Sequence, residues 1–495
     1  AAPARGEPNP PWPGSAHLGA WRPPFAAAAM SRGRGRIGWL VPPACVSERN
    51  VKLSLSLSVL ASLVSTIAHG HLFTAFIFEL FQNNAAVGLT ESVTGFTALV
   101  FAVPVGFAVD KISRTKLLRF CAVLGLMAAI TGALAVVLGP RMVHTAEDGS
   151  RQPPGRAFTV LLVASLAFWG VFFNTTASAA LALFADSVPR SSRQARQDLY
   201  ATKATLRCAA FSAGPLVAFV CTVLTGNDWK LEHMSYALLP GFLLMPVMCT
   251  VLNFFEEVDS KIADLEVGLL DSPKSRVDPD ALTLERLKAP GARWVPYLLL
   301  TAEVTTAIGA GMTVKFFGLW FKNVFAFTPA GLAALSSATP IAMAIATDLL
   351  KRVARACPFG PVPAVLGFWL ASIACLLAMV RVQDWRILVG LHLVRTALAN
   401  AKEPIATAIL ADFIPSSKRG RWNALHSLTG MTFTGSAALG GILCDRYGYG
   451  KTFFITAGLY LVAAAFWVPL IRLVPGDKVK GGGSTGDVAD KVKGG

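Results

Sequence analysis

Twelve apolar stretches of about 20 residues or more follow one another along the chain, separated by polar segments. A helix rises 1.5 Å per residue, so about 20 residues cross the roughly 30 Å hydrocarbon layer of a bilayer. The runs are continuously apolar and do not alternate with polar residues, which favours helices over the strands of a membrane barrel. The pattern predicts twelve transmembrane helices, over residues 55–81, 87–109, 117–139, 157–184, 201–225, 234–254, 295–322, 329–350, 361–381, 386–410, 422–444 and 452–473.

The composition agrees with a bilayer as the main solvent. Hydrophobic residues make up 54% of the 495 residues and charged residues 15%. A soluble domain carries about 25% charged residues, so an ordinary soluble enzyme, a disordered protein and a small disulfide scaffold are all excluded. The eight cysteines form no CxxC pair and mostly lie in apolar runs. They are expected to be small buried residues, with no disulfide framework and no metal site.

The positive charges are distributed unevenly between the two sides of the predicted membrane. Lys and Arg number 45 against 29 Asp and Glu, which gives a net charge of +16. With a cytosolic N-terminus, the five inner gaps hold 18 Lys and Arg, and the six outer gaps hold 6. Cytosolic loops are enriched in Lys and Arg, so both termini are predicted to be cytosolic. The short basic loops indicate a membrane surface and not a groove for nucleic acid.

The longest polar gap divides the predicted helices into six and six. The sequence therefore predicts an N-terminal half over 51–254, a cytosolic linker over 255–293 and a C-terminal half over 294–473. Residues 1–50 are rich in Pro, Ala, Gly and Arg, and are interpreted as a disordered leader or an organelle transit segment. Residues 474–495 repeat DKVKGG and are expected to form a flexible cytosolic tail.

The two halves resemble each other in sequence. ALFADSVPRSSR at 182–193 aligns without gaps with AILADFIPSSKR at 408–419, at an offset of 226 residues. At the same offset Asn174 aligns with Asn400. Each half is therefore interpreted as a copy of the other, as in transporters built from parallel repeats around an axis along the membrane normal.

The loop after the second predicted helix carries a recognisable motif. GFAVDKISRTK at 106–116 resembles G-x-x-x-D-[RK]-x-G-[RK]-x-[RK], the signature loop of the major facilitator superfamily, with Ser113 where glycine is usual. The resemblance extends to the number of spans, the central linker and the duplication. It implies an all-α polytopic fold of twelve helices in two pseudo-symmetric halves, and a secondary transporter. The matching residues are Gly106, Asp110, Lys111, Arg114 and Lys116.

Charged residues at the expected cytosolic helix ends are candidate gate residues. The resemblance implies that the signature loop latches the halves in one conformation, and Gly106 would allow close helix approach. A second alignment, at an offset of 238, pairs Asp110 with Asp348. An acidic residue at a helix C-terminus opposes the helix dipole, so Asp186 and Asp412 are expected to pair with nearby cations. The alternative is a plain positive loop with solvated charges. The remaining gate candidates are Asp186 with Arg193, and Asp412 with Arg419.

Polar residues at membrane depth are candidates for solute binding or coupling. A charge in the middle of a bilayer costs several kcal/mol unless it faces water or a partner. The resemblance implies that spans 1, 4, 7 and 10 line the cavity. A metal pair of histidines two residues apart is not expected, because they face different ways on a helix. A purely structural ion pair of Lys402 or Glu403 with Glu303 or Lys315 remains an alternative. The candidates are His69, His71, Asn174, Glu303, Lys315, Arg395, Asn400, Lys402 and Glu403.

The sequence contains none of the hydrolase, metalloprotease or nucleotide-binding motifs, so an enzyme is not predicted and no cofactor is expected. The leading hypothesis is a monomeric multi-pass protein of the plasma membrane or an organelle membrane. It would move a small polar or anionic solute by alternating access. Its partners would be the bilayer and the solute, and any coupled proton or other ion could be carried by a histidine or glutamate of the cavity. The alternative is a transporter-like receptor or scaffold that does not transport.

Overall fold

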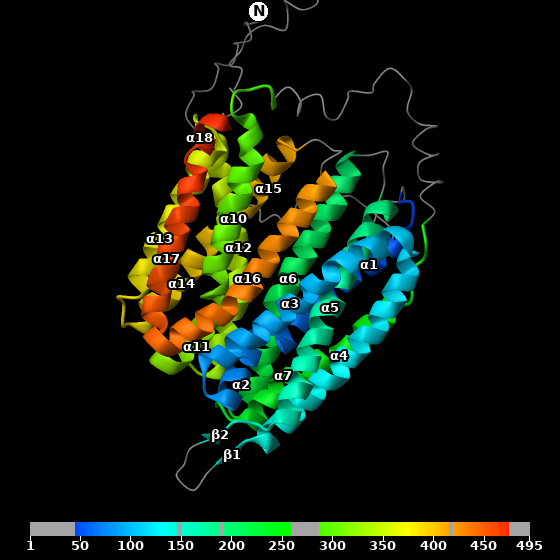
Figure 1. Cartoon of the computed structure of the whole chain (residues 1–495), viewed down its shortest axis with the longest axis vertical. Helices are drawn as coiled ribbons and strands as arrows, with labels where there is room; N and C mark the ends of the chain where they lie inside the picture. The colour runs from blue at the N-terminus through cyan, green and yellow to red at the C-terminus, as the bar shows by residue number, and fades with distance from the viewer. Residues whose placement is uncertain (1–44, 146–150, 189–192, 259–286, 415–418, 475–495) are drawn as a thin grey trace, which may run out of the picture.

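The computed structural model describes residues 45–145, 151–188, 193–258, 287–414 and 419–474. Most of the predicted leader, linker and tail lie outside these residues. The described chain is a bundle of long helices (Figure 1) with one short ribbon, in which β1 (His144–Thr145) pairs antiparallel with β2 (Arg151–Gln152). The predicted all-α fold class is confirmed.

Within the described residues, each half contributes six crossings. In the N-terminal half these are α1 (Glu48–Ala68) continued by α2 (His71–Phe81), then α3 (Asn84–Lys111), α4 (Arg114–Met142), α5 (Arg156–Ser187), α6 (Arg193–Thr225) and α7 (Leu231–Leu252). A short helix, η1 (Ala292–Trp294), leads into the C-terminal half. Its crossings are α10 (Val295–Gly311) with α11 (Val314–Phe325), α12 (Pro329–Ala356), α13 (Pro361–Met379), α14 (Trp385–Ala401) with α15 (Glu403–Asp412), α16 (Arg419–Tyr447), and α17 (Tyr449–Trp467) followed by α18 (Leu470–Leu473).

The twelve described crossings match the twelve predicted spans in order and position. By length and composition, ten of them are apolar enough to cross a membrane. The other two are α14 with α15, which is broken at Lys402, and α16, which carries several Thr, Ser and Gly residues.

The duplication is visible in the backbone. The first crossing of each half is broken near its middle, between α1 and α2 and between α10 and α11. The second segment of each ends on a residue in the left-handed conformation, Gln82 with φ 54° and Ala326 with φ 51°. The packing also repeats, because α1 lies against α6 and α7, and α10 lies against α16 and α17. These repeats support the interpretation of the halves as copies.

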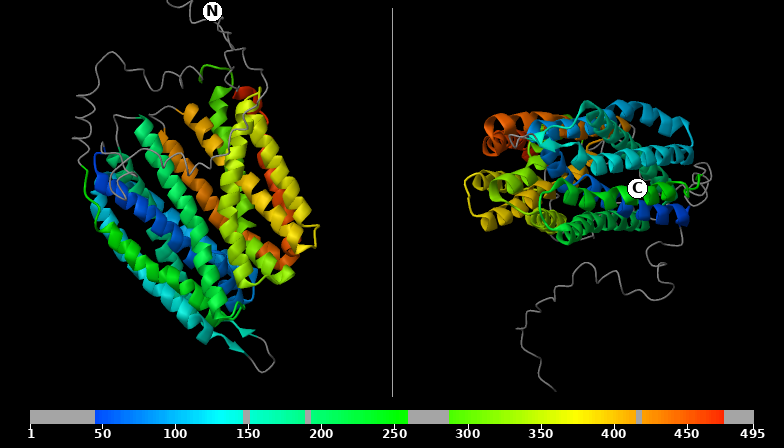
Figure 2. Two further views of the ribbon diagram at one scale, coloured as in Figure 1. Left: turned by 180° about the vertical axis from the view of Figure 1, so that it is seen from behind. Right: turned by 90° about the horizontal axis from the view of Figure 1, so that it is seen from below.

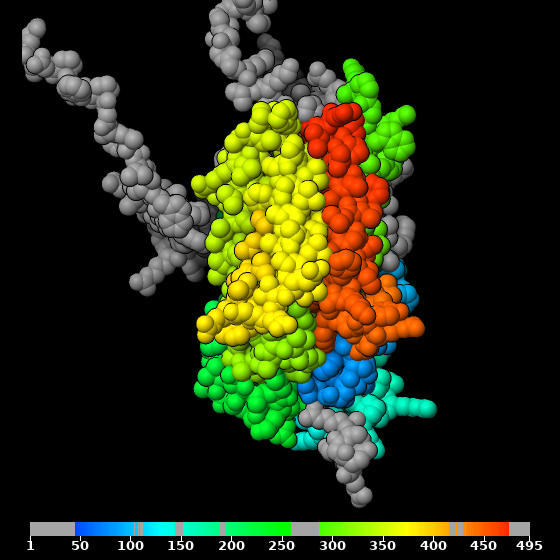
Figure 3. Space-filling model, turned by 90° about the vertical axis from the view of Figure 1, so that its left-hand side faces the viewer, coloured from blue at the N-terminus to red at the C-terminus, as the bar shows by residue number. Residues whose placement is uncertain are grey.

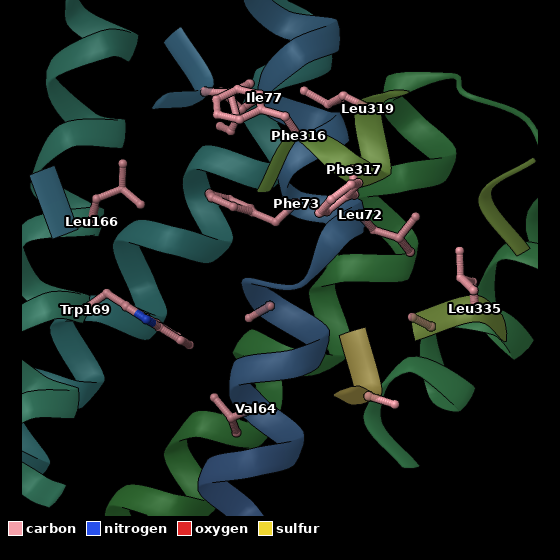
Figure 4. Packing of buried hydrophobic residues seen from close by; sticks show 14 of the residues in the cluster. Val64, Leu72, Phe73, Ile77, Leu166, Trp169, Phe316, Phe317, Leu319 and Leu335 are labelled. Atoms are coloured by element: carbon pink, nitrogen blue, oxygen red, sulfur yellow. The ribbon is translucent and has the colours of Figure 1, made fainter. Parts of the chain in front are cut away.

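Apolar side chains fill the interior of the bundle and also cover its outer surface. The largest fully buried side chains are phenylalanines, among them Phe76, Phe172 and Phe316, and some members of this core are shown in Figure 4. Large apolar side chains also cover the outer surface, as at Phe120 and Ile130. An apolar exterior of this size is expected of a surface in contact with lipid. The fold therefore places its apolar residues as a membrane bundle does.

The two halves meet through α3 against α16 and α6 against α12. We call the end where α7 ends and α10 begins the linker end, and the opposite end, where α2 ends and α3 begins, the far end. The hydrogen bonds and close glycine approaches between α3 and α16 join residues 84–95 to residues 434–445, which is the far-end part of both helices. Figures 1 and 2 show the halves diverging toward the linker end.

Small residues allow the close approach at the far end. A Cβ atom on Gly88 would lie 2.3 Å from the carbonyl oxygen of Ala437, and one on Gly441 would lie 2.3 Å from that of Asn84. The α3 and α16 backbones therefore touch. Figure 3 shows the same junction from the side, with the α2–α3 region (blue) against the α16–α17 region (orange). A Cβ atom on Gly106, by contrast, would meet no described atom of another helix within 4 Å, so the expected close approach there is not seen.

Candidate functional site

A cavity of about 810 Å³ lies between the halves. The N-terminal half lines it with the α1–α2 break, α3, α5 and α6, and the C-terminal half with helices α10 to α17. Both broken first crossings reach it, through Gly70 on one side and Val314 on the other. A break exposes backbone polar groups, which membrane proteins tolerate where the chain lines a cavity. The volume is within the range of small-molecule sites.

Eight of the nine residues predicted for solute binding or coupling line this cavity. The exception is Asn174, whose Nδ2 donates a hydrogen bond of 3.2 Å to the carbonyl oxygen of Ala98 and so joins α5 to α3. The eight that the structure brings together are His69, His71, Glu303, Lys315, Arg395, Asn400, Lys402 and Glu403. Their roles in binding or coupling stay predictions.

Three buried or half-buried cations line the described part of the cavity, and the first is Lys315, at the start of α11. It forms an ion pair with Glu91 of α3, and about a fifth of each side chain is exposed. The pair joins the two halves. The sequence-based alternative paired Lys315 with Glu403, whereas the structure pairs it with Glu91. Glu91 was missed because it lies in span 2, although a glutamate in an apolar run was itself a signal.

The second cation, Lys402, lies at the break between α14 and α15. Its residue is 7% exposed, and its Nζ lies 4.3 Å from the centre of the Trp369 ring, within range of a cation–π interaction. Glu303 and Glu403 act on it electrostatically. Both glutamates belong to the same half as Lys402, so this charge cluster does not bridge the halves.

The third cation, Arg395 of α14, is 3% exposed. Its Nη2 donates to Tyr460 Oη at 3.1 Å, and its guanidinium carbon lies 4.9 Å from the centre of the Phe317 ring. Its Nε has no hydrogen-bond partner in the described part of the chain. His392, one turn earlier on α14, is also buried, and its ring lies 5.0 Å from that of Phe317. Sequence reasoning missed His392 and Tyr460.

The two predicted histidines of the first crossing occupy different surroundings, as their spacing implied. His69 stacks on Trp169 with ring centres 3.7 Å apart, and Phe73 lies 4.4 Å away. Figure 4 shows Trp169 directed from α5 toward the chain between α1 and α2. His71 instead lies beside α11, because a Cβ on Gly318 would be 3.2 Å from its Nδ1. Within the described residues, no group of three or more His, Cys, Asp or Glu side chains is placed to hold a metal ion.

At the linker end, the described gate candidates form contacts inside each half. Arg114 pairs with Asp186, and its Nη1 donates to the carbonyl oxygen of Ala182 at 3.3 Å, both within the N-terminal half. Asp348 pairs with Arg352 one turn along α12. Asp186 is thus paired with Arg114, whereas the side chain of Arg193, its expected partner, lies outside the described part. Gly106, Lys116 and Asp412 are exposed, and the side chains of Asp110, Lys111, Arg193 and Arg419 lie outside the described part.

Polar contacts that close one end of the cavity lie instead at the far end. Asp445, near the end of α16, accepts hydrogen bonds from the backbone N–H groups of Asn84 and Ala85 at 2.9 and 2.8 Å, and from Asn84 Nδ2 at 2.7 Å. Tyr449 Oη donates to Asn84 Oδ1 at 2.8 Å. Asp445 therefore caps the first turn of a helix in the other half, where free N–H groups and the helix dipole favour a carboxylate.

Two further contacts close the far end. Lys322 of α11 forms a buried ion pair with Glu79 of α2. In the turn between α6 and α7, the Nε1 of Trp229 donates to the carbonyl oxygen of Phe327 at 2.9 Å. By sequence alone Glu79 could be interpreted as a merely interfacial charge, and the structure places it in this contact between the halves. Sequence reasoning missed Lys322 and Trp229, because polar residues near span ends are ordinary at a membrane surface.

Comparison with known proteins agrees with this architecture. A family model described as Major Facilitator Superfamily matches residues 359–492. The structure is similar to a D-xylose–proton symporter, with a TM-score of 0.62 at 11% identity, covering 88% of this chain and 99% of that one. It is also similar to an inward-facing bacterial homologue of the human lysosomal transporter Spinster, with a TM-score of 0.59 at 12% identity, covering 86% and 98%. No curated protein matches the sequence.

A third structural neighbour is the nucleoside transporter NupG, with a TM-score of 0.55 at 15% identity, covering 85% of this chain and 99% of that one. Twelve described crossings in two repeated halves around a polar cavity define an integral, multi-pass membrane protein. The chain has the fold of these transporters, and the family model over residues 359–492 agrees with the resemblance to the major facilitator superfamily drawn from the signature loop.

Proposed function

We propose that this chain is a secondary transporter that moves a small polar or anionic solute across the membrane by alternating access. The observation that carries the proposal is the polar cavity of about 810 Å³ between two halves that are joined at the far end by the Asp445 cap and the Glu79–Lys322 pair. A solute in such a cavity would be released on the other side if the halves tilted about it. The energy would come from gradients of the solute or of a coupled ion.

The conformation favours access from the linker end. The far-end parts of α3 and α16 are in backbone contact, and the Asp445 cap and the Glu79–Lys322 pair close the same end. We assign the linker end to the cytosol, because the inner gaps of the sequence carry most of the Lys and Arg. In this assignment the structure corresponds to an inward-facing state, and the predicted gate residues would meet only after the linker end closes.

Proton coupling is part of the proposal. His69, His71, Glu303 and Glu403 all line the cavity and can change charge state. One structural neighbour is a D-xylose–proton symporter, which supports the idea without identifying the solute of this chain. The alternative, a transporter-shaped receptor without transport, is not favoured, because the charged residues of the cavity are present in both halves.

The test is flux into liposomes that contain the purified full-length protein. A panel of neutral, anionic, cationic and zwitterionic solutes is offered with and without an inward proton gradient. We expect saturable uptake of at least one class and loss of that uptake in Lys315→Ala. Lys351→Ala, which removes an exposed lysine of α12, is the matched control and should transport as the wild type does. Folded protein that moves no solute of any class would contradict the proposal.

A further inference from the structure

The three described cations of the cavity differ in how their charges are balanced. Lys315 is paired with Glu91, and Lys402 lies in the field of Glu303 and Glu403. Arg395 instead contacts neutral groups, the hydroxyl of Tyr460 and the aromatic ring of Phe317. A buried guanidinium that keeps its charge costs free energy unless an anion joins it, because desolvation removes its favourable interaction with water. Arg395 is therefore the cation of the cavity best suited to receive an anion from outside the protein.

Several buried polar atoms of residues that line the cavity also lack a partner within the described residues. They are Arg395 Nε itself, Nδ1 of His392, Oγ1 of Thr396 and Nδ1 of His71, and all four residues line the cavity. His392, Arg395 and Thr396 occupy positions i, i+3 and i+4 of α14, so they share one face of that helix. Buried polar atoms without partners are rare in folded proteins and are costly, by about 1–3 kcal/mol each. Four such atoms on residues that line one cavity point to a ligand.

The chemistry of the cluster indicates what that ligand carries. Arginine Nε can only donate, a threonine hydroxyl can donate, and an imidazole nitrogen donates in one of its tautomers or when protonated. A group with several acceptor oxygens and a negative charge satisfies these donors together, and a guanidinium matches a carboxylate or phosphate in geometry. A neutral hydroxyl compound would leave the guanidinium charge uncompensated.

The surrounding helices hold the arginine in place. Tyr460 of α17 accepts from Arg395 Nη2, and the Nε1 of Trp369 donates to the carbonyl oxygen of Tyr460 at 3.0 Å. Ser372 of α13 donates to the carbonyl oxygen of Arg395 at 3.0 Å. The ring of Phe317 lies against both Arg395 and His392. The guanidinium is thus fixed before a ligand arrives, which lowers the entropy cost of binding.

We propose that Arg395, His392 and Thr396 of α14, with His71 of α2 from the other half, form a subsite for an oxyanion group of the transported solute, either a carboxylate or a phosphate. The inference rests on the proposed function and names its substrate class. The remainder of the solute occupies the rest of the cavity. Because His71 belongs to the N-terminal half and the other three residues to the C-terminal half, binding at this subsite contacts both moving parts.

The test measures binding to the purified full-length protein by the shift of its melting temperature. The probes are matched pairs that differ only in the oxyanion: lactate with lactamide, succinate with succinamide, and glycerol 3-phosphate with glycerol, together with inorganic sulfate. We expect a shift with oxyanion members and none with their neutral partners. Response to the carboxylates alone or to the phosphate alone identifies the source of the oxyanion.

Substitutions identify the residues that produce the shift of melting temperature with oxyanions. Arg395→Gln should weaken oxyanion binding about tenfold to a hundredfold, as expected for the loss of charge-assisted hydrogen bonds, and Arg395→Lys should recover part of it. Arg386→Gln, which removes an exposed arginine at the start of the same helix, is the control and should bind as the wild type does. If Arg395→Gln fails to fold, Thr396→Val, which keeps the shape of the side chain, should still weaken binding severalfold.

Two results separate the inference from the proposed function. Liposomes that transport a neutral solute equally well with wild type and Arg395→Gln would overturn the oxyanion subsite and leave the transporter intact. Oxyanion binding that depends on Arg395, in a protein that carries no solute across liposomes, would uphold the subsite and contradict transport. Equal binding of both members of every pair, or of none, overturns the subsite in either case.

Discussion

The charged residues of the cavity differ in their surroundings and in the helices that they connect. Lys315 and Glu91 join the halves, Lys402 is held within one half over Trp369, and Arg395 is fixed by neutral neighbours. A charge at membrane depth is costly unless an opposite charge or water compensates it. Removing one member of an ion pair therefore leaves the other charge uncompensated and destabilises the protein. The effect of substituting one of these residues on the free energy of unfolding should therefore depend strongly on whether its partner is present.

A double-mutant cycle on Glu91 and Lys315 tests this at the residue scale. Glu91→Gln and Lys315→Gln should each destabilise the protein by about 1–3 kcal/mol, below the value for a fully buried pair because each side chain is about one-fifth exposed. The double variant should lose less free energy of unfolding than the sum of the losses of the two single variants. Unfolding measured in detergent gives the coupling energy, and strictly additive losses would show that the two charges do not interact.

At the scale of helices, the far end is closed by one helix capping another across the halves. Asp445 accepts from the first two N–H groups of α3, while Asn83, the N-cap residue of α3, accepts from Ala86 at 2.7 Å. The first turn of α3 is thus satisfied partly by its own half and partly by the other. Opening the far end would leave the N–H groups of Asn84 and Ala85 to water.

Asp445→Ala should therefore favour opening of the far end as well as weakening a cap. Loss of a cap typically costs about 1 kcal/mol. Asp384, which caps its own helix α14 by accepting from the N–H of Arg386 at 2.8 Å, supplies a matched control. Both alanine variants should lower the melting temperature, and only Asp445→Ala should increase labelling of the cavity from the far-end side in sealed vesicles. Equal labelling in the two variants would contradict a role for Asp445 in closure.

At the scale of the whole molecule, the number and order of the crossings were predictable because run length reflects bilayer thickness. Most cavity residues were predictable for a related reason: charges within apolar runs must face partners or water. The breaks at Gly70 and near Met312 were not predicted, since glycine or methionine within an apolar run is also found in unbroken helices. Ion-pair partners such as Glu91 depend on which helices lie side by side, and spacing along one chain does not specify that.

The predicted gate at the linker end also illustrates the limit of the sequence. A sequence records residues that serve every conformation, whereas one structure contains the contacts of a single conformation. The described polar contacts that close the cavity belong to the far end, through Asp445 and Lys322. The residues repeated at the linker end remain candidates for the contacts of the opposite state.

The most direct test of alternating access is a pair of distances measured by pulsed electron resonance in one protein. In a cysteine-free background, spin labels at exposed Lys116 and Arg355 report on the linker end, and labels at exposed Gln152 and Gln383 report on the far end. On addition of a transported solute, we predict a shorter population at the linker end and, reciprocally, a longer one at the far end. Two distances that stay unchanged while the protein transports would contradict alternating access.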